Sequence, residues 1–177
     1  QLGPLTRKSI EPMADAAGLP PRSLQEFLSF LDWDEAKARD RLQRIVVRDH
    51  GSPDAIGLID DTGHLKKGRK TPGVAYQYCG KTAKIDNCVV TVHLGYAVGD
   101  FHCLLDGDVF LPESWAHDRD RCRAAGIPDA SEHRPKWQIA LDLLDRARAN
   151  GVRPDALTFD ADYGKVPEFL FALDDRN

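Results

Sequence analysis

Two short acidic segments, each directly after an apolar run, are the residues of this sequence best suited to chemistry. Asp60-Asp61-Thr62-Gly63 follows residues 55–59, and Asp160-Ala161-Asp162-Tyr163-Gly164 follows residues 156–159. Two or three carboxylates brought together form a hard, anionic oxygen site suited to Mg²⁺. Paired Mg²⁺ ions can activate a water or a 3′-hydroxyl and stabilise the leaving oxygen in phosphodiester displacement. Aspartate after a strand is also an ordinary turn former and helix N-cap, and this structural alternative stays open.

A purely basic stretch follows the first acidic segment. Residues 63–84 contain six basic residues and no acidic ones, although the whole chain has a formal net charge of −4. The net charge gives no bulk attraction to a polyanion, but a local patch beside a metal site can hold phosphates. A solvated hairpin that turns at Gly68 and Gly73 is the alternative. Tyr76 and Tyr78 either stack on a frayed base or are strand residues with one ring in the core. The basic residues are Lys66, Lys67, Arg69, Lys70, Lys81 and Lys84.

The elements that must position these residues change in kind near residue 54. Residues 1–53 show helical periodicity, and we expect helices over 10–17, over 21–31 and from 35 onward after an Asp34 N-cap. The first two, joined at Gly18, form either a DNA-reading helix-turn-helix or a plain helical hairpin. We therefore divide the chain into a small helical region, 1–53, and a second domain, 54–177.

Strands and helices alternate in the second domain, which predicts an α/β fold. Asp106 and Asp108 flank Gly107 in one of these strands and indicate a turn or bulge rather than a site. The expected order is a strand over 55–60, two or three antiparallel strands that include 87–97 and 101–111, a charged loop over 112–134, a helix over 135–150, a strand over 156–159 and a helix over 166–173.

Composition excludes several classes of protein. The 177 residues are 42% hydrophobic and 29% charged, which suits a globular domain and argues against disorder. The sequence contains no apolar run long enough for a transmembrane helix, so we expect no membrane contact and a cytoplasmic location. The four cysteines form no CxxC motif, which argues against a zinc ribbon, and we expect free thiols.

Five sequence blocks occur in colinear order across nearly the whole chain. They are Ile59-Asp-Asp-Thr-Gly-His-Leu-Lys-Lys-Gly68, Gly73-Val-Ala-Tyr-Gln-Tyr-Cys-Gly80, Lys84-Ile-Asp-Asn-Cys88, Leu111-Pro-Glu-Ser-Trp115 and Thr158-Phe-Asp-Ala-Asp-Tyr-Gly164. Together they resemble the DDE transposases of the IS701 group, within the IS4-like superfamily of DDE endonucleases. The resemblance implies an RNase H-like mixed sheet with flanking helices. It also implies Mg²⁺-dependent cleavage of transposon ends, with Mn²⁺ as a substitute, and transfer of the freed 3′-hydroxyl into target DNA.

The resemblance assigns roles to individual residues. The first catalytic, metal-binding aspartate is expected at Asp61, because the superfamily pattern is an Asp directly followed by Thr, with Asp60 as the alternate. The second is expected at Asp160, with Asp162 as the alternate. The third acid of the family, a glutamate on a later helix, has no counterpart, because Glu168 follows Asp160 too closely. We therefore expect either a fragment or a shortened relative of a transposase.

The resemblance also implies partners. Transposon-end and target DNA are the expected substrates, the six basic residues are the expected DNA contacts, and a homodimer is expected because two ends must be paired. DNA as substrate further implies association with the nucleoid. The alternative is a non-catalytic DNA-binding or regulatory derivative that keeps the helices and the basic hairpin.

Overall fold

A computed structural model of the chain describes residues 5–7 and 9–176. The chain separates into two compact units, the first ending at Ala38 and the second beginning at Arg39. The first contains α1 (Ile10–Ala16) and α2 (Pro21–Ser29), which contact each other across a turn at Gly18. Gly18 has a φ of +66°, the left-handed conformation that favours glycine after a helix. The predicted helical hairpin is confirmed, whereas DNA reading by it and a domain boundary at residue 53 stay predictions.

Helix α3 (Glu35–His50) begins where the sequence predicts. The Oδ1 atom of Asp34 accepts a hydrogen bond from the backbone N–H of Lys37 at 2.9 Å, which is the expected N-cap contact. Val46 of this helix is buried in the core of the second unit together with Tyr96 and Ala147.

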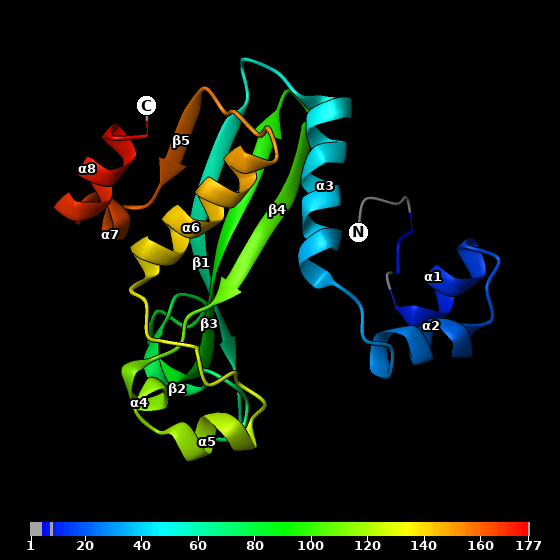
Figure 1. The fold of residues 1–177 in the computed structure, drawn as a ribbon, viewed down its shortest axis with the longest axis horizontal. Coiled ribbons are helices and arrows are strands. Elements are labelled where there is room, and N and C mark those ends of the chain that lie inside the picture. Colours follow the sequence, from blue (N-terminus) through cyan, green and yellow to red (C-terminus); the bar gives the residue numbers. More distant parts are fainter. Residues whose placement is uncertain (1–4, 8, 177) are drawn as a thin grey trace. The chain divides into compact units, whose positions relative to one another are not determined.

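A five-stranded mixed sheet forms the centre of the second unit (Figure 1). The long strand β3 pairs antiparallel with β1, β2 and β4, and β5 pairs parallel with β1. The parallel pairing of the first and last strands confirms the expected RNase H-like arrangement. The strands are β1 (Ile56–Leu65), β2 (Ala75–Cys79), β3 (Lys84–Val98), β4 (Phe101–Val109) and β5 (Ala156–Phe159).

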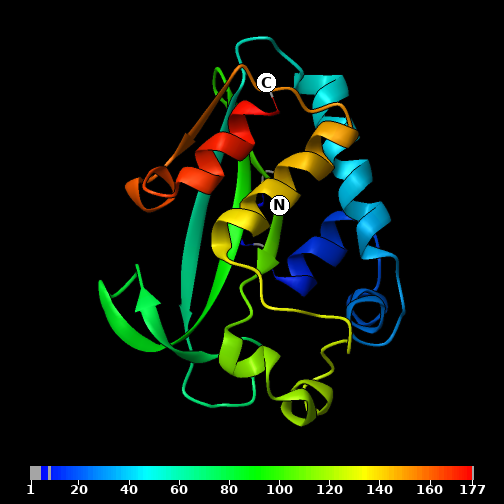
Figure 2. The same cartoon turned by 60° about the vertical axis from the view of Figure 1, so that its left-hand side comes forward.

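Helices α6 (Lys136–Ala149) and α8 (Pro167–Asp174) contact each other, and α6 packs on the sheet (Figure 1, Figure 2). The apolar face of α6 packs on the inward side chains of β3, and Phe169 of α8 completes this core. Both helices begin beside a proline, whose fixed φ suits a first helical turn. The main core residues are Val92, Leu94, Tyr96, Ile139, Leu143 and Phe169.

Three short helices were not predicted from the sequence: α4 (Glu113–Ala116), α5 (Arg119–Ala124) and α7 (Ala161–Gly164). The first two lie in the charged loop over 112–134. They form there because Trp115 is fully buried, with its Nε1 donating to the carbonyl of Val74 at 2.7 Å. A buried indole of this size organises the backbone around it.

Two strands also differ from the prediction. Strand β1 continues to Leu65 instead of ending at Asp60, because β3 is long enough to pair with it as far as Cys88. Cross-strand pairing with the valines of β3 outweighs the poor strand propensity of Asp and Gly. In β4 the expected turn or bulge at Gly107 is absent, since Gly107 pairs regularly with His93; the β3–β4 register instead shifts between Leu94 and Gly95, which leaves Leu105 without a pairing partner. Asp106, next to Leu105, is also a buried ion-pair partner.

Of the helices in residues 5–7 and 9–176, none has the length and apolar character needed to cross a membrane. All four cysteines are free thiols, as expected.

Candidate active site

The β1–β5 pairing brings the two acidic segments to one place in the sheet, which we call the acidic junction. Ile59 pairs with Phe159 in a parallel register, so the next residue on each strand is an aspartate. Gly57 permits this approach, because a Cβ there would lie 2.5 Å from Cδ2 of Leu157. The carboxylates were predicted to end both strands. In the structure they lie at the end of β5 but in the middle of β1.

The neighbours Asp60 and Asp61 point to opposite faces of the sheet, as successive strand residues must. Asp61 shares the face of the buried Ile59 and has a side chain that is 27% exposed. Asp60 lies on the exposed face, and its Oδ1 accepts the backbone N–H of Asp61 at 2.8 Å. Only Asp61 of the pair therefore faces the helices that follow β5.

Asp160 is the N-cap of the short helix α7. Its Oδ1 accepts the backbone N–H groups of Asp162 at 2.9 Å and of Tyr163 at 3.2 Å. N-capping is the structural alternative that the sequence leaves open for this aspartate. It occupies Oδ1 and leaves Oδ2 of the same carboxylate available to a ligand. The exposed Asp162 carboxylate lies 3.3 Å from the Nζ atom of Lys165.

A cavity of about 110 Å³ opens beside these groups. Asp61 and Asp162 both line it, together with Tyr163. The Tyr163 hydroxyl is buried and has no hydrogen-bond partner within the described part of the chain. Burial raises the pKa of this phenol, and the nearby charges of Asp61 and Asp160 raise that pKa further. An unpaired polar oxygen at this depth is costly unless a ligand or a water completes it.

Lys136, at the start of α6, is a site residue that the sequence analysis missed. Its Nζ lies 2.6 Å from Oδ2 of Asp61, and its side chain is 33% exposed. The same Nζ lies 5.8 Å from the ring centroid of Phe110. A cation in the first turn opposes the helix dipole, which favours acidic residues there. That unfavourable position was the available signal that Lys136 serves a partner outside its own helix.

The donor set at this position suits a hard divalent cation. Asp61 and Asp160 supply carboxylate oxygens. Both charges raise the pKa of the nearby Tyr163 hydroxyl, which has no hydrogen-bond partner among the described residues. In the range 5–7 and 9–176, however, no three or more His, Cys, Asp or Glu side chains are arranged to hold a metal ion. The described residues therefore form no closed metal cage.

The six basic residues predicted to contact DNA are all exposed. Four of them lie on the β1–β2 loop, Lys81 lies on the β2–β3 turn, and Lys84 opens β3 and lies 3.6 Å from a carboxylate oxygen of Asp86. The loop is held at two points. Asn87 Nδ2 donates to the carbonyl of Lys66 at 2.6 Å, and Arg121 donates to the carbonyl of Arg69 at 3.0 Å.

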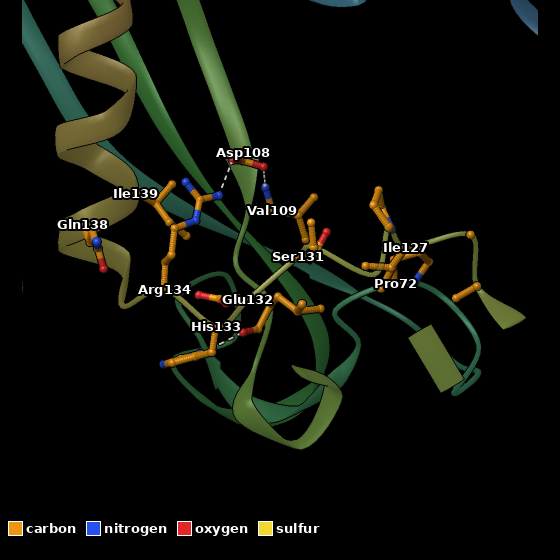
Figure 3. Close-up of a pocket in the computed structure, with 15 residues that line it drawn as sticks. Pro72, Asp108, Val109, Ile127, Ser131, Glu132, His133, Arg134, Gln138 and Ile139 are labelled. Carbon is orange, nitrogen blue, oxygen red and sulfur yellow. Dashed lines mark hydrogen bonds and ion pairs between the residues drawn. The ribbon is translucent and has the colours of Figure 1, made fainter. Parts of the chain in front are cut away.

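A larger cavity of about 600 Å³ lies elsewhere, between the segment 125–134 and the ends of β4 and α6 (Figure 3). Arg134 points into it and donates to Asp108 at 2.7 Å (Figure 3). Arg134 also pairs with Asp142, so its charge is already balanced. None of the four candidate aspartates lines this cavity.

Comparison with known proteins identifies the family to which the chain belongs. The family model described as "DDE superfamily endonuclease" matches residues 1–177. The chain belongs to this family, which confirms the resemblance found in the sequence blocks.

A probable transposase for insertion sequence element IS701, from Microchaete diplosiphon, is 33% identical to the chain over 177 residues. The match covers 98% of the chain and 43% of the relative, so the chain spans less than half of that protein's length. No solved structure matches the chain.

Proposed function

We propose that the chain carries the first two catalytic aspartates, Asp61 and Asp160, of a metal-dependent DDE transposase that cuts transposon ends and transfers them into target DNA. The observation that carries this proposal is the parallel β1–β5 register, which juxtaposes two acidic segments on one sheet. Asp61 is preferred over Asp60 because it lines the cavity, and Asp162 remains the alternate to Asp160.

Different residues would bind the ion and the DNA. Asp61 and Asp160 would hold Mg²⁺, or Mn²⁺ in its place, through carboxylate oxygens. A divalent ion bound there supplies charge stabilisation and activation of a water or 3′-hydroxyl. Lys136 lies 2.6 Å from the Asp61 carboxylate and would compete with the ion for it. The exposed loop and hairpin cations would hold DNA phosphates beside this junction, and two chains would pair two transposon ends.

The test is metal binding and DNA nicking by the 177-residue chain with Asp61→Asn and Asp160→Asn. We expect each variant to lose Mn²⁺ binding, measured by electron paramagnetic resonance, and to lose metal-dependent nicking of a supercoiled plasmid. Asp60→Asn is the matched control, because its carboxylate lies on the opposite face of β1. Unchanged binding and nicking in both Asp61→Asn and Asp160→Asn would refute the catalytic assignment.

A second candidate function is a non-catalytic DNA-binding or regulatory derivative of a transposase. Two observations favour it: the described residues contain no group of three or more possible metal ligands, and Lys136 already balances the charge of Asp61. This candidate predicts DNA binding that is insensitive to both aspartate substitutions and to the removal of divalent ions.

A further inference from the structure

The β2–β3 hairpin exposes two tyrosines on one face. Tyr76 is 73% exposed and Tyr78 is 57% exposed, and Ile85, which pairs with Tyr78 across the two strands, is 70% exposed. Of the two alternatives for these tyrosines, the one that places a ring in the core is therefore wrong. Residues 76 and 78 share a face because they are two apart on a strand, and the residue between them, Gln77, points inward to donate to the carbonyl of Cys88 at 3.0 Å.

The spacing of the two rings matches a stacked base. Side chains two apart on a strand are separated by about 6.6–6.8 Å and stand roughly perpendicular to the sheet. Neighbouring bases in DNA are separated by about 3.4 Å along each strand. One flat base therefore fits between the rings of Tyr76 and Tyr78, with a ring on each of its faces.

The hydrogen bonds of the hairpin place positive charge beside these rings. Tyr76 pairs across the strands with Asn87, whose backbone carbonyl accepts the N–H of Lys66 at 2.9 Å. The Asn87 side chain donates to the carbonyls of Lys66 and Gly68 at 2.6 and 3.0 Å. The strand position opposite Tyr76 thus anchors the start of the basic loop. At the other end of the hairpin, Lys84 pairs with the buried Cys79, so it lies on the face opposite the tyrosines, 3.6 Å from Asp86.

The hairpin therefore carries an exposed aromatic face with the basic β1–β2 loop beside it at one end, and it extends away from α6 and α8 (Figure 2). Exposed aromatic side chains beside a backbone-tracking basic groove are the pattern by which proteins bind single-stranded nucleic acid. Paired bases in a duplex do not offer free faces to such rings. The charge pattern thus favours a polyanion with unpaired bases as the occupant over an apolar protein surface.

We propose that Tyr76 and Tyr78 bind an unpaired DNA base, with Lys66 contacting a flanking phosphate. This inference rests on the proposed function, because it makes the DNA substrate of the chain locally unpaired. It adds a recognition element that neither the acidic junction nor the basic loop supplies by itself.

The test compares two fluorescein-labelled probes by anisotropy: an oligothymidylate of about 12 nucleotides and a duplex of the same length. The 177-residue chain is compared with its Tyr76→Ala/Tyr78→Ala variant. We expect the variant to bind the single strand at least about fivefold more weakly and the duplex unchanged. The slope of log affinity against log salt should stay the same, because stacking releases no counterions.

Two matched variants separate stacking from general effects. Tyr76→Phe/Tyr78→Phe keeps both rings and should keep the single-strand affinity, which also shows that the hairpin folds. Phe171→Ala removes an aromatic ring that is 71% exposed on α8 and should change nothing.

Three results would overturn the proposal: unchanged single-strand binding in the alanine variant, an equal loss for both probes, or an alanine variant that changes the sedimentation of the free chain, which would identify a contact between copies. Absence of binding to either probe by the unsubstituted chain would refute both this inference and the DNA substrate of the proposed function. If duplex binding and metal-dependent nicking persist without a preference for the single strand, only this inference fails.

Discussion

Helix α6 carries a cation near each end that reaches an aspartate of the sheet, and the two contacts differ in kind. Arg146, in its last turn, donates to Asp106 at 2.7 Å, and the Asp106 side chain is completely buried. Lys136, at its start, contacts Asp61 at 2.6 Å beside an open cavity. Asp106 also lies 3.6 Å from Arg39 and accepts a hydrogen bond from Gln43 at 3.5 Å.

The comparison separates a structural carboxylate from a site carboxylate. Asp106 is enclosed and has three partners from two helices, so a ligand has no access to it. Asp61 keeps one cation partner among the described residues and faces a cavity that also contains an unpaired phenol. A third ion pair of α6, between Asp145 and Arg176 of the C-terminal segment, is largely exposed. Burial of the carboxylate thus varies widely among the ion pairs of one helix.

The largest effect on stability is expected at the buried contact. Asp106→Asn keeps the shape of the side chain but leaves Arg146 without its counter-charge. Because Arg146 is only partly exposed and loses a charge-assisted hydrogen bond, we expect the free energy of unfolding to fall by about 1.5–3 kcal/mol, measured by urea denaturation. Asp108→Asn, whose side chain is 36% exposed, is the control and should cost less than about 1 kcal/mol. Similar costs for the two variants would contradict the distinction.

The opposite pattern is expected at Asp61. Asp61→Asn should change the free energy of unfolding by less than about 1 kcal/mol, because Lys136 can turn to solvent when its partner is neutralised. The same variant should lose Mn²⁺ binding. Urea denaturation and metal titration of one protein sample measure both quantities. A loss of stability as large as that of Asp106→Asn would mean that Asp61 is a structural carboxylate as well.

A smaller effect is expected from the cation at this site. Lys136→Met keeps the length of the side chain and removes its charge, so it removes a competitor for the Asp61 carboxylate. We expect Mn²⁺ to bind about threefold to tenfold more tightly, which corresponds to about 0.6–1.4 kcal/mol. Lys136→Arg should bind Mn²⁺ like the unsubstituted chain. Weaker binding by Lys136→Met would instead mean that the lysine orients Asp61 for the ion.

The smallest effect is expected at the exposed pair, and it depends on pH. The hydrogen bond from Arg176 holds the pKa of Asp145 below its ordinary value of 3.8. The unfolded chain therefore takes up a proton on this carboxyl before the folded chain does, so the stabilisation is present above pH 3.8 and disappears as the pH falls through the lowered pKa. We expect Arg176→Met to cost less than about 1 kcal/mol at pH 7. As the pH is lowered below 3.8, the difference in thermal unfolding between the variant and the unsubstituted chain should shrink, and a difference that does not shrink would contradict the assignment.

Much of the fold follows from local sequence patterns. The strand over 156–159 and the helix after Pro135 have clear apolar periodicity, and Asp34 is a recognisable N-cap. The acidic segment at Asp160 could be predicted because it directly follows an apolar strand. The colinear blocks added the RNase H-like pairing of the first and last strands, which periodicity alone does not specify.

The remaining features depend on contacts between distant residues. Strand β1 extends past Asp61 only because β3 pairs with it, and strand propensity gives no sign of that pairing. Lys136 is 75 residues from Asp61 in sequence, so their contact needs the three-dimensional arrangement of α6 and β1. The exposure of Tyr76 was not predictable either, since alternation identifies two faces of a strand but not which one a neighbour covers.

The parallel register of β1 and β5 also makes the acidic junction a product of folding. The strands that meet there are separated by about 100 residues, so closing this loop has an entropic cost that local contacts do not offset. A divalent ion that binds Asp61 and Asp160 together recognises only the closed chain, and its binding free energy adds to that of folding. At a hundredfold excess over its dissociation constant, this linkage amounts to about 2.7 kcal/mol. A metal ion bound there would therefore act as a reversible cross-link between β1 and β5.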